Sequence, residues 1–231
     1  MRLDQFVAQC SWLSRKDAKR AIAAGRVRVN HQVCKQAKHQ LTGTDEVQLD
    51  SQPLAAPGKL YLMMNKPAGV ISATTDSDQP TALDLLPGEI AARVHIAGRL
   101  DKDTTGLLLL TSDGQWSHRV TSPRRECPKS YRVTLAEAVT EDALHALEQG
   151  VLLKGDNAPT RPATVTRHSS SDIELIIYEG RYHQVKRMLA AVGNHVLALH
   201  RNSIGQIILD DDLAPGQFRH LSENEIRSIT E

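Results

Sequence analysis

Eight residues, Ser51–Gly58, interrupt every hydrophobic periodicity on either side of them. They read Ser-Gln-Pro-Leu-Ala-Ala-Pro-Gly, and proline and glycine break helix and strand patterns alike. A stretch of this kind is typical of a linker, so we place a domain boundary there. The 231-residue chain then divides into a small module, residues 1–50, a linker, residues 51–58, and a larger domain, residues 59–231.

The small module carries far more positive charge than the rest of the chain. Its first 40 residues hold nine Lys and Arg against two acids, a net charge of +7. The remaining residues hold 19 bases and 25 acids, a net charge of −6. A basic module joined to a mildly acidic body indicates that the module binds a polyanion such as nucleic acid.

The module is predicted to contain two helices followed by short strands. A first helix over residues 2–10 gathers its apolar side chains on one face. A second helix begins after Ser14, a good N-cap with Asp17 three residues later, and ends near Gly25. Strands are predicted over residues 26–30, 32–35 and 46–50, with a turn at 30–31.

Four cations on the second helix form like-charged pairs four residues apart. Arg15 is paired in this way with Lys19, and Lys16 with Arg20. Such pairs destabilise an isolated helix, so a bound anion is an attractive explanation for them. A solvated helix face is the alternative.

The larger domain mixes helices with a majority of strands. Residues 183–192 predict an amphipathic helix that Gly193 ends, and Thr140 and Ser222 are N-caps of two more helices. Strands are predicted over residues 60–65, 106–112, 129–135, 163–168, 172–178, 196–200 and 206–209. Because the strands outnumber the helices and their order is irregular, we expect an α+β fold with a largely antiparallel mixed sheet.

Several classes of protein do not fit the composition. No apolar run approaches the roughly 20 residues of a membrane span, and the first residues lack the apolar stretch of a signal peptide. The three cysteines are far apart and form no C-x-x-C pair, which argues against a disulfide framework and a zinc knuckle. The glycine motifs of nucleotide sites do not occur. We expect a cytoplasmic protein without membrane association and without a metal site.

One polar loop leads directly into a predicted buried strand. Residues 98–105 read Gly-Arg-Leu-Asp-Lys-Asp-Thr-Thr, and four leucines follow Gly106. Asp101 and Asp103 would therefore lie on a backbone that a buried strand holds in place. Active sites commonly lie on such loops, although an ordinary surface turn also favours Gly and Asp.

A basic face accompanies the start of the helix predicted over residues 183–192. Arg181 lies just before this helix, and His183, Lys186 and Arg187 stand on the side opposite its apolar stripe. Cations at a helix start can hold phosphate or pair with a carboxylate. A solvated basic face is the alternative interpretation.

A tyrosine stands close to a lysine in the segment Lys129-Ser130-Tyr131. Only 3% of the residues are aromatic, which makes this tyrosine noticeable. Aromatic side chains beside cations are the groups that stack unpaired bases of RNA. A tyrosine on a strand is, however, more often part of the core.

Five motifs follow one another along the larger domain. They are Asn65-Lys66-Pro67 with Gly69-Val70; Gly98-Arg99-Leu100-Asp101 with Thr104, Gly106-Leu107 and Asp113-Gly114; Lys129-x-Tyr131; Glu179-Gly180-Arg181 with Gln184-Val185-Lys186-Arg187-Met188; and Leu199-His200-Arg201 with Ile204-Gly205. Together they resemble the pseudouridine synthases of the RsuA family over essentially all of residues 59–231. Residues 1–50 resemble the alpha-L RNA-binding domain that this family carries. Segments 114–119 and 193–196 look closest to the member that modifies one uridine of small-subunit (16S) rRNA.

The resemblance implies an enzyme that isomerises a uridine to pseudouridine in ribosomal RNA without a cofactor. Asp101 is matched to the catalytic carboxylate, which acts as a nucleophile or deprotonates and stabilises the sugar. Lys186 is matched to the cation that offsets desolvation of this carboxylate, where many relatives have Arg. Tyr131 is matched to the aromatic that stacks on the base, and its hydroxyl is a candidate for moving the proton of the uracil carbon.

The resemblance also implies where RNA binds. Arg99, beside Asp101, is expected to contact RNA while the nucleotide is flipped out. Arg181, Arg187 and the four helix cations are expected to contact RNA too, and Asp103 is expected to be structural. The expected partner is 16S rRNA in a partly assembled small subunit, and the protein is expected to be a monomer.

Three alternatives stay open from the sequence. The same reaction could take place on large-subunit (23S) rRNA. A non-catalytic rRNA-binding assembly factor could use the same scaffold, although Asp101, Tyr131 and Lys186 are all present. A metal-dependent nuclease could use Asp101 and Asp103, but the sequence offers no third convergent acid.

Overall fold

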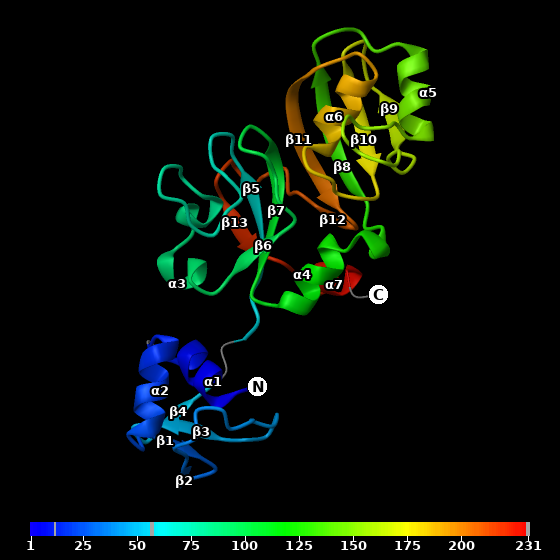
Figure 1. Ribbon diagram of the computed structural model, residues 1–231. Helices are drawn as coiled ribbons and strands as arrows, with labels where there is room; N and C mark the ends of the chain where they lie inside the picture. The colour runs from blue at the N-terminus through cyan, green and yellow to red at the C-terminus, as the bar shows by residue number, and fades with distance from the viewer. Residues whose placement is uncertain (12, 56–57, 230–231) are drawn as a thin grey trace. The chain divides into compact units, whose positions relative to one another are not determined.

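The computed structural model describes residues 1–11, 13–55 and 58–229. The chain forms two compact units, Met1–Lys59 and Leu60–Glu231 (Figure 1). Both units contain helices and strands, so the predicted α+β class is confirmed. Within the described ranges, no helix is both long enough and apolar enough to cross a membrane.

The first unit packs two helices against a small antiparallel sheet. The helices are α1 (Leu3–Cys10) and α2 (Arg15–Ala23). The strands are β1 (Val27–Val29), β2 (Gln32–Val33), β3 (Val47–Leu49) and β4 (Gln52–Leu54), in the spatial order β2-β1-β3-β4. Leu3, Val7 and Ile22 from the helices meet Val27 and Val47 from the sheet in a buried core.

The predicted start of the second helix is confirmed, as is the first hairpin. Ser14 Oγ accepts a hydrogen bond from the Asp17 amide at 3.2 Å, which caps α2. Asn30 and His31 both have positive φ, 49° and 66°, as a two-residue hairpin turn requires. Both predictions are confirmed because a helix cap and a hairpin turn each depend on interactions among only a few neighbouring residues.

The predicted linker, residues 51–58, is wrong in its first half. Asp50 and Ser51 adopt left-handed φ angles of 51° and 67°, and the chain then returns as β4 along β3. Pro53 is tolerated because β4 is an edge strand of the sheet, where a missing N–H leaves no partner unsatisfied. The first unit therefore extends past residue 50. Residues 56 and 57 of the predicted linker lie outside the described residues.

The second unit is built on one mixed sheet. Its described strands are β5 (Tyr61–Lys66), β6 (His95–Ala97), β7 (Thr105–Thr111), β8 (Lys129–Leu135), β9 (Thr164–Arg167), β10 (Asp172–Ile177), β11 (Val196–Ile204), β12 (Ile207–Ile208) and β13 (Phe218–His220). Their order is β13-β5-β7-β11-β8-β10-β9, with β6 beside β7 and β12 beside β11. The β7–β11 pair is parallel and the other recorded pairs are antiparallel, which confirms the predicted sheet.

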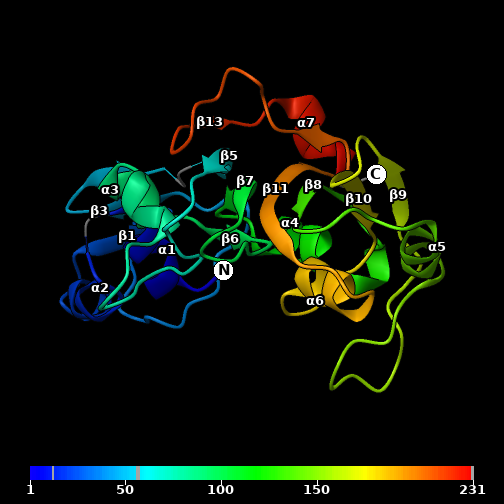
Figure 2. The ribbon, with the colours of Figure 1, turned by 90° about the horizontal axis from the view of Figure 1, so that it is seen from above.

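Helices cover both faces of this sheet. They are α3 (Gly88–Ala91), α4 (Gly114–Thr121), α5 (Glu141–Gln149), α6 (Gln184–Ala191) and α7 (Glu223–Ser228), with short 3-10 helices η1 (Ala82–Leu85) and η2 (Pro123–Arg125). Figure 2 shows α6 and α7 on opposite sides of β8 and β11. The four leucines of β7 are fully buried, since Leu107 and Leu109 join the core with α4 while Leu108 and Leu110 join the core with α6.

Two predictions for the second unit need correction. The predicted helix 183–192 begins one residue later, because His183 has a left-handed φ of 48° and precedes the first helical residue. Asp113-Gly114, predicted only as the end of a strand, starts α4. The Asp113 carboxylate accepts hydrogen bonds from the amides of Gln115 and Trp116, so the same residues that suggest a turn form a helix cap.

Candidate functional site

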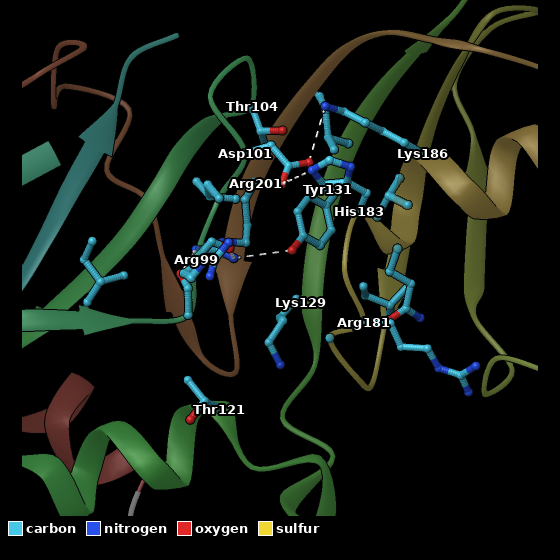
Figure 3. Close-up of a pocket in the computed structure, with 18 residues that line it drawn as sticks. Arg99, Asp101, Thr104, Thr121, Lys129, Tyr131, Arg181, His183, Lys186 and Arg201 are labelled. Atoms are coloured by element: carbon cyan, nitrogen blue, oxygen red, sulfur yellow. Dashed lines mark hydrogen bonds and ion pairs between the residues drawn. The ribbon is translucent and has the colours of Figure 1, made fainter. Parts of the chain in front are cut away.

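A pocket of about 360 Å³ lies within the second unit, at the junction of β7, β8, β11 and the start of α6. Its walls include the loop of residues 98–104, Lys129 and Tyr131 of β8, and Leu199 of β11 (Figure 3). The segment from Gly180 to Lys186 closes another side. The polar loop, the basic segment at the start of α6 and the segment Lys129–Tyr131, which are far apart in the sequence, therefore meet at one pocket.

The polar loop is held in place by the last residue of β5, Lys66, and by the segment that follows this strand. The buried ammonium of Lys66 donates to the carbonyl oxygens of Pro67 at 2.9 Å and Thr104 at 2.8 Å, and lies 3.3 Å from that of Lys102. The amide of Gly69 also donates to the carbonyl of Lys102, at 2.9 Å. These contacts explain why the Asn65-Lys66-Pro67 motif accompanies the loop, since it fixes the main chain on which the acids stand.

Gly106 lets two strands approach closely beside the loop. It has a φ of +100° and pairs with Arg201 across the parallel β7–β11 contact. An added Cβ would lie 2.4 Å from the carbonyl oxygen of Arg201, so any larger side chain would push the strands apart. The glycine thus determines how near β11 comes to the loop.

The Asp101 carboxylate lies between the imidazole of His183 and the ammonium of Lys186. Its Oδ1 is 3.3 Å from Nε2 of His183, and its Oδ2 is 3.3 Å from Nζ of Lys186. Figure 3 shows these three side chains pointing toward one another beside the ring of Tyr131. The juxtaposition of Asp101 with Lys186 agrees with the expected pair, whereas the His183 contact was not predicted.

Asp103 shares the same ammonium. Its Oδ1 lies 2.6 Å from Nζ of Lys186, which is closer than the nearest oxygen of Asp101. This hydrogen bond lowers the pKa of Asp103. Burial opposes the charge of Lys186, but the hydrogen bond to Asp103 and the charge of Asp101 outweigh it and raise the pKa of the ammonium. Lys186 is therefore a cation held by two carboxylates.

A buried arginine lies under the loop and beside the tyrosine. Arg201 is 1% exposed and donates from Nε to the carbonyl of Leu107 at 2.8 Å and from Nη2 to that of Gly98 at 2.9 Å. Its Nη1 lies 3.4 Å from the hydroxyl of Tyr131, and its guanidinium carbon is 5.9 Å from the centre of that ring. Arg201 therefore ties the loop backbone to the aromatic wall of the pocket.

Arg181 and Arg187, which were predicted to contact RNA, have intramolecular partners. Both guanidiniums bind the carboxylate of Asp156, at 2.9 Å and 2.5 Å. Arg181 also pairs with Glu179 and donates to two main-chain carbonyls, and Arg187 donates to the carbonyl of Lys154. Figure 3 shows the guanidinium of Arg181 pointing away from Asp101. These contacts do not support an RNA contact. They hold the loop before α6 in place.

Two of the four cations of α2, Arg15 and Lys19, lie near a carboxylate of the first unit to which the sequence assigned no role. Asp4 is fully buried, and Arg2, Arg15 and Lys19 lie 2.8, 3.6 and 4.0 Å from it. The hydrogen bonds from Arg2 lower the pKa of Asp4 despite its burial. The like-charged pair Arg15/Lys19 thus has an internal counter-charge, and a bound anion is not needed to explain it.

Three residues of the site were not assigned a role from the sequence: Lys66, His183 and Arg201. A signal was present for Lys66, a cation at the end of a mostly apolar strand, because such cations are buried only where they find partners. Arg201 stands among the polar residues His200, Asn202 and Ser203 of β11, which gives no such signal. Within the described chain, no three His, Cys, Asp or Glu side chains converge as a metal site would require.

Comparisons with known proteins agree with this geometry. The family model for RNA pseudouridylate synthase matches residues 60–191, and the S4 domain model matches residues 1–47. The ribosomal small subunit pseudouridine synthase A of Escherichia coli (strain K12) is 49% identical over 99% of this chain and 100% of its own length. The protein of the same name from Haemophilus influenzae is 44% identical, with 99% of both chains covered.

A solved structure shares the fold. It is a crystal structure of a pseudouridylate synthase that superposes with a TM-score of 0.73 at 43% identity, covering 99% of both chains. The family match, residues 60–191, includes the loop of Asp101, Lys129 and Tyr131 of β8 and the start of α6, whereas Leu199 and Arg201 of the pocket lie beyond it. The chain therefore belongs to the RNA pseudouridylate synthase family and is an RNA pseudouridine synthase that also carries an S4 domain.

Proposed function

We propose that this enzyme isomerises one uridine of 16S rRNA to pseudouridine and that Asp101 is the carboxylate that acts on the ribose. The observation that carries the proposal is the position of Asp101, which lines the pocket between the imidazole of His183 and the ammonium of Lys186 and near the aromatic ring of Tyr131. Full-length relatives named for the small ribosomal subunit support the choice of rRNA.

The reaction makes clear demands on such a site. The bond from uracil N1 to ribose C1′ breaks, the base turns, and a bond from C5 to C1′ replaces it, while the proton of C5 leaves and N1 gains one. Asp101 attacks the sugar as a nucleophile or removes a sugar proton, and both routes need an ionised carboxylate. The ammonium of Lys186 places a positive charge 3.3 Å from the Asp101 carboxylate, which favours its ionised form.

The aromatic wall is suited to a flipped-out uracil. Tyr131 is 7% exposed and lines the pocket together with Leu199, so a base that enters can stack on the ring and pack against the leucine. Arg201 holds the tyrosine hydroxyl at the edge of the pocket. We assign to the ring of Tyr131 the role of stacking on the uracil. We assign to its hydroxyl the transfer of the proton that leaves the uracil carbon C5.

The remaining cations are proposed to bind the RNA backbone. Arg99 lines the pocket next to Asp101. Arg15, Lys16, Lys19 and Arg20 stand exposed on α2 of the S4 domain. The substrate is proposed to be 16S rRNA in a partly assembled small subunit, with the enzyme acting as a monomer in the cytoplasm, where subunits are assembled.

The test is to map pseudouridine after incubation of the protein with 16S rRNA alone, with 16S rRNA bound by ribosomal proteins, and with 23S rRNA. We expect one modified uridine in 16S rRNA, none in 23S rRNA, and faster modification of the protein-bound form. Asp101→Asn is the matched control and should leave all three RNAs unmodified. Modification confined to 23S rRNA would refute the proposed substrate, and binding without modification would indicate an assembly factor.

A further inference from the structure

Two aromatic rings are stacked on each other at the rim of the pocket, and the chemistry derived above gives no role to one of them, that of Tyr182. The ring centroids of Tyr182 and His183 are 3.8 Å apart, with an angle of 22° between the planes. His183 lines the pocket, whereas Tyr182 is 69% exposed. A single exposed tyrosine needs no explanation by itself, but its place beside the proposed catalytic group does.

The backbone that carries these rings is held firmly. His183 has a φ of 48°, a left-handed conformation that is uncommon for a residue other than glycine and is found often at functional sites. The carbonyl of Tyr182 accepts a hydrogen bond from Arg187 at 3.3 Å, and Gln184 accepts one from the amide of Arg181 at 2.8 Å. The stacked pair therefore stands on a fixed segment.

The stack is connected directly to the reacting group. His183 reaches Oδ1 of Asp101 with its Nε2, at 3.3 Å, and carries Tyr182 on its ring face. One face of Tyr182 lies on His183, and the high exposure of the side chain leaves the other face open to solution. A planar group placed on that face would complete a stack of three: the group itself, Tyr182, and His183, which contacts Asp101.

We propose that Tyr182 is a platform for an unpaired base adjacent to the target uridine in the substrate RNA. The inference rests on the proposed function, because a uridine flipped into the pocket loses its stacking neighbours and leaves their faces uncovered. Aromatic side chains compensate for this loss by stacking on such bases. By fixing that neighbour relative to Asp101, the Tyr182–His183 stack selects targets with an unpaired base next to the uridine.

The experiment measures binding in the Asp101→Asn background, so that no turnover interferes. Three RNA stem-loops are used: one that carries the mapped target uridine, and two in which the base on its 5′ or its 3′ side is removed. Tyr182→Ala should weaken binding of the intact RNA about 5- to 150-fold, which corresponds to stacking of one base. The loss should vanish with one of the two abasic RNAs, and Tyr182→Phe should bind within about twofold of the parent.

The matched control is Ile208→Ala, because Ile208 is similarly exposed, at 66%, and lies outside this pocket. It should change none of the three affinities. A Tyr182→Ala variant that binds the intact RNA as tightly as its parent would refute the platform. Equal losses on all three RNAs would refute it too and would assign Tyr182 a structural role. Absence of pseudouridine when the wild-type enzyme meets the intact RNA would instead contradict the proposed function.

Discussion

Asp101 and Asp156 each contact two basic side chains in the second unit, yet the two clusters differ in construction. The side chains are similarly exposed, 27% for Asp101 and 23% for Asp156. Asp156 is held by two guanidiniums, Arg181 at 2.9 Å and Arg187 at 2.5 Å. Asp101 is 3.3 Å from both the imidazole of His183 and the ammonium of Lys186. The exposure of the side chain and the number of basic partners therefore do not distinguish the two aspartates.

The kind of donor does distinguish them. A guanidinium offers several N–H groups in a rigid fork and occupies the lone pairs of a carboxylate, whereas an ammonium is a compact point charge. The contacts of Asp101 to His183 and Lys186 are longer than those of Asp156 to its two arginines, so the oxygens of Asp101 are held less tightly. Asp101 can thus meet a substrate, while Asp156 fixes the loop before α6.

The largest expected effect is a difference in the rate of pseudouridine formation between variants of these two aspartates. Asp101→Asn should lower the rate of pseudouridine formation at least about 10³-fold, which is ~4 kcal/mol of barrier, with RNA binding retained. Asp156→Asn should leave the rate within about tenfold of wild type, because its carboxylate does not line the pocket. Single-turnover rates and filter binding measure both. A folded Asp156→Asn enzyme as inactive as Asp101→Asn would overturn the comparison.

The next effect concerns the cation of the reactive cluster. Lys186→Met should lower the single-turnover rate about 10²-fold, ~2.7 kcal/mol of barrier, with little change in RNA affinity. Lys186→Arg should keep part of the rate, since the positive charge remains and many relatives have Arg at the matched position. Weak binding combined with normal turnover in Lys186→Met would show that Lys186 contacts phosphate rather than Asp101.

A smaller effect is expected at the aromatic wall of the pocket. Tyr131→Ala should cost ~1–3 kcal/mol of RNA binding, the usual contribution of one stacked base. Tyr131→Phe should bind like wild type, so any loss of turnover in that variant reports the hydroxyl. Full activity of a correctly folded Tyr131→Ala enzyme would make the tyrosine a core residue only.

The smallest expected effect concerns the contribution of Asp156, the aspartate that holds the loop before α6, to the stability of the fold. Hydrogen bonds from Arg187 and then Arg181 hold the pKa of Asp156 below its ordinary value of 3.8. A lowered carboxyl pKa contributes stability that is present above pH ~3.8 and is lost as the pH falls through the folded-state pKa. Wild type should therefore exceed Asp156→Asn in the free energy of unfolding at neutral pH, and urea titrations should show the difference shrinking below about pH 4. A difference independent of pH would mean that charge is not involved.

Sequence patterns predicted those parts of the site that depend on side-chain periodicity and caps. The apolar stripe of α6 and the buried leucines of β7 predicted the two elements that bring Lys186 and Asp101 together. The resemblance supplied the pairing itself, because no periodicity links residues so far apart in the chain.

The parts that escaped prediction depend on the main chain. Lys66 and Arg201 donate mostly to carbonyl oxygens, which every residue has and no sequence pattern reveals. His183 fits the helical period but takes a left-handed conformation, and this turns its ring toward Asp101 instead of along the helix. Pro53 reads as a linker residue, although an edge strand accepts it.

The ammonium of Lys66 is buried, and a rise in pH should for this reason increase the stability of the protein and lower its rate of turnover. Burial lowers its pKa from 10.5 to about 8, even though Asp103 and Asp101 act to raise it. Between these values the unfolded chain binds more protons than the folded one, so the free energy of unfolding should rise with pH. The neutral amine, however, has only two N–H groups for the three carbonyls that position the loop. Between about pH 7 and pH 9, urea titrations should therefore show a more stable protein, while single-turnover assays show a slower one.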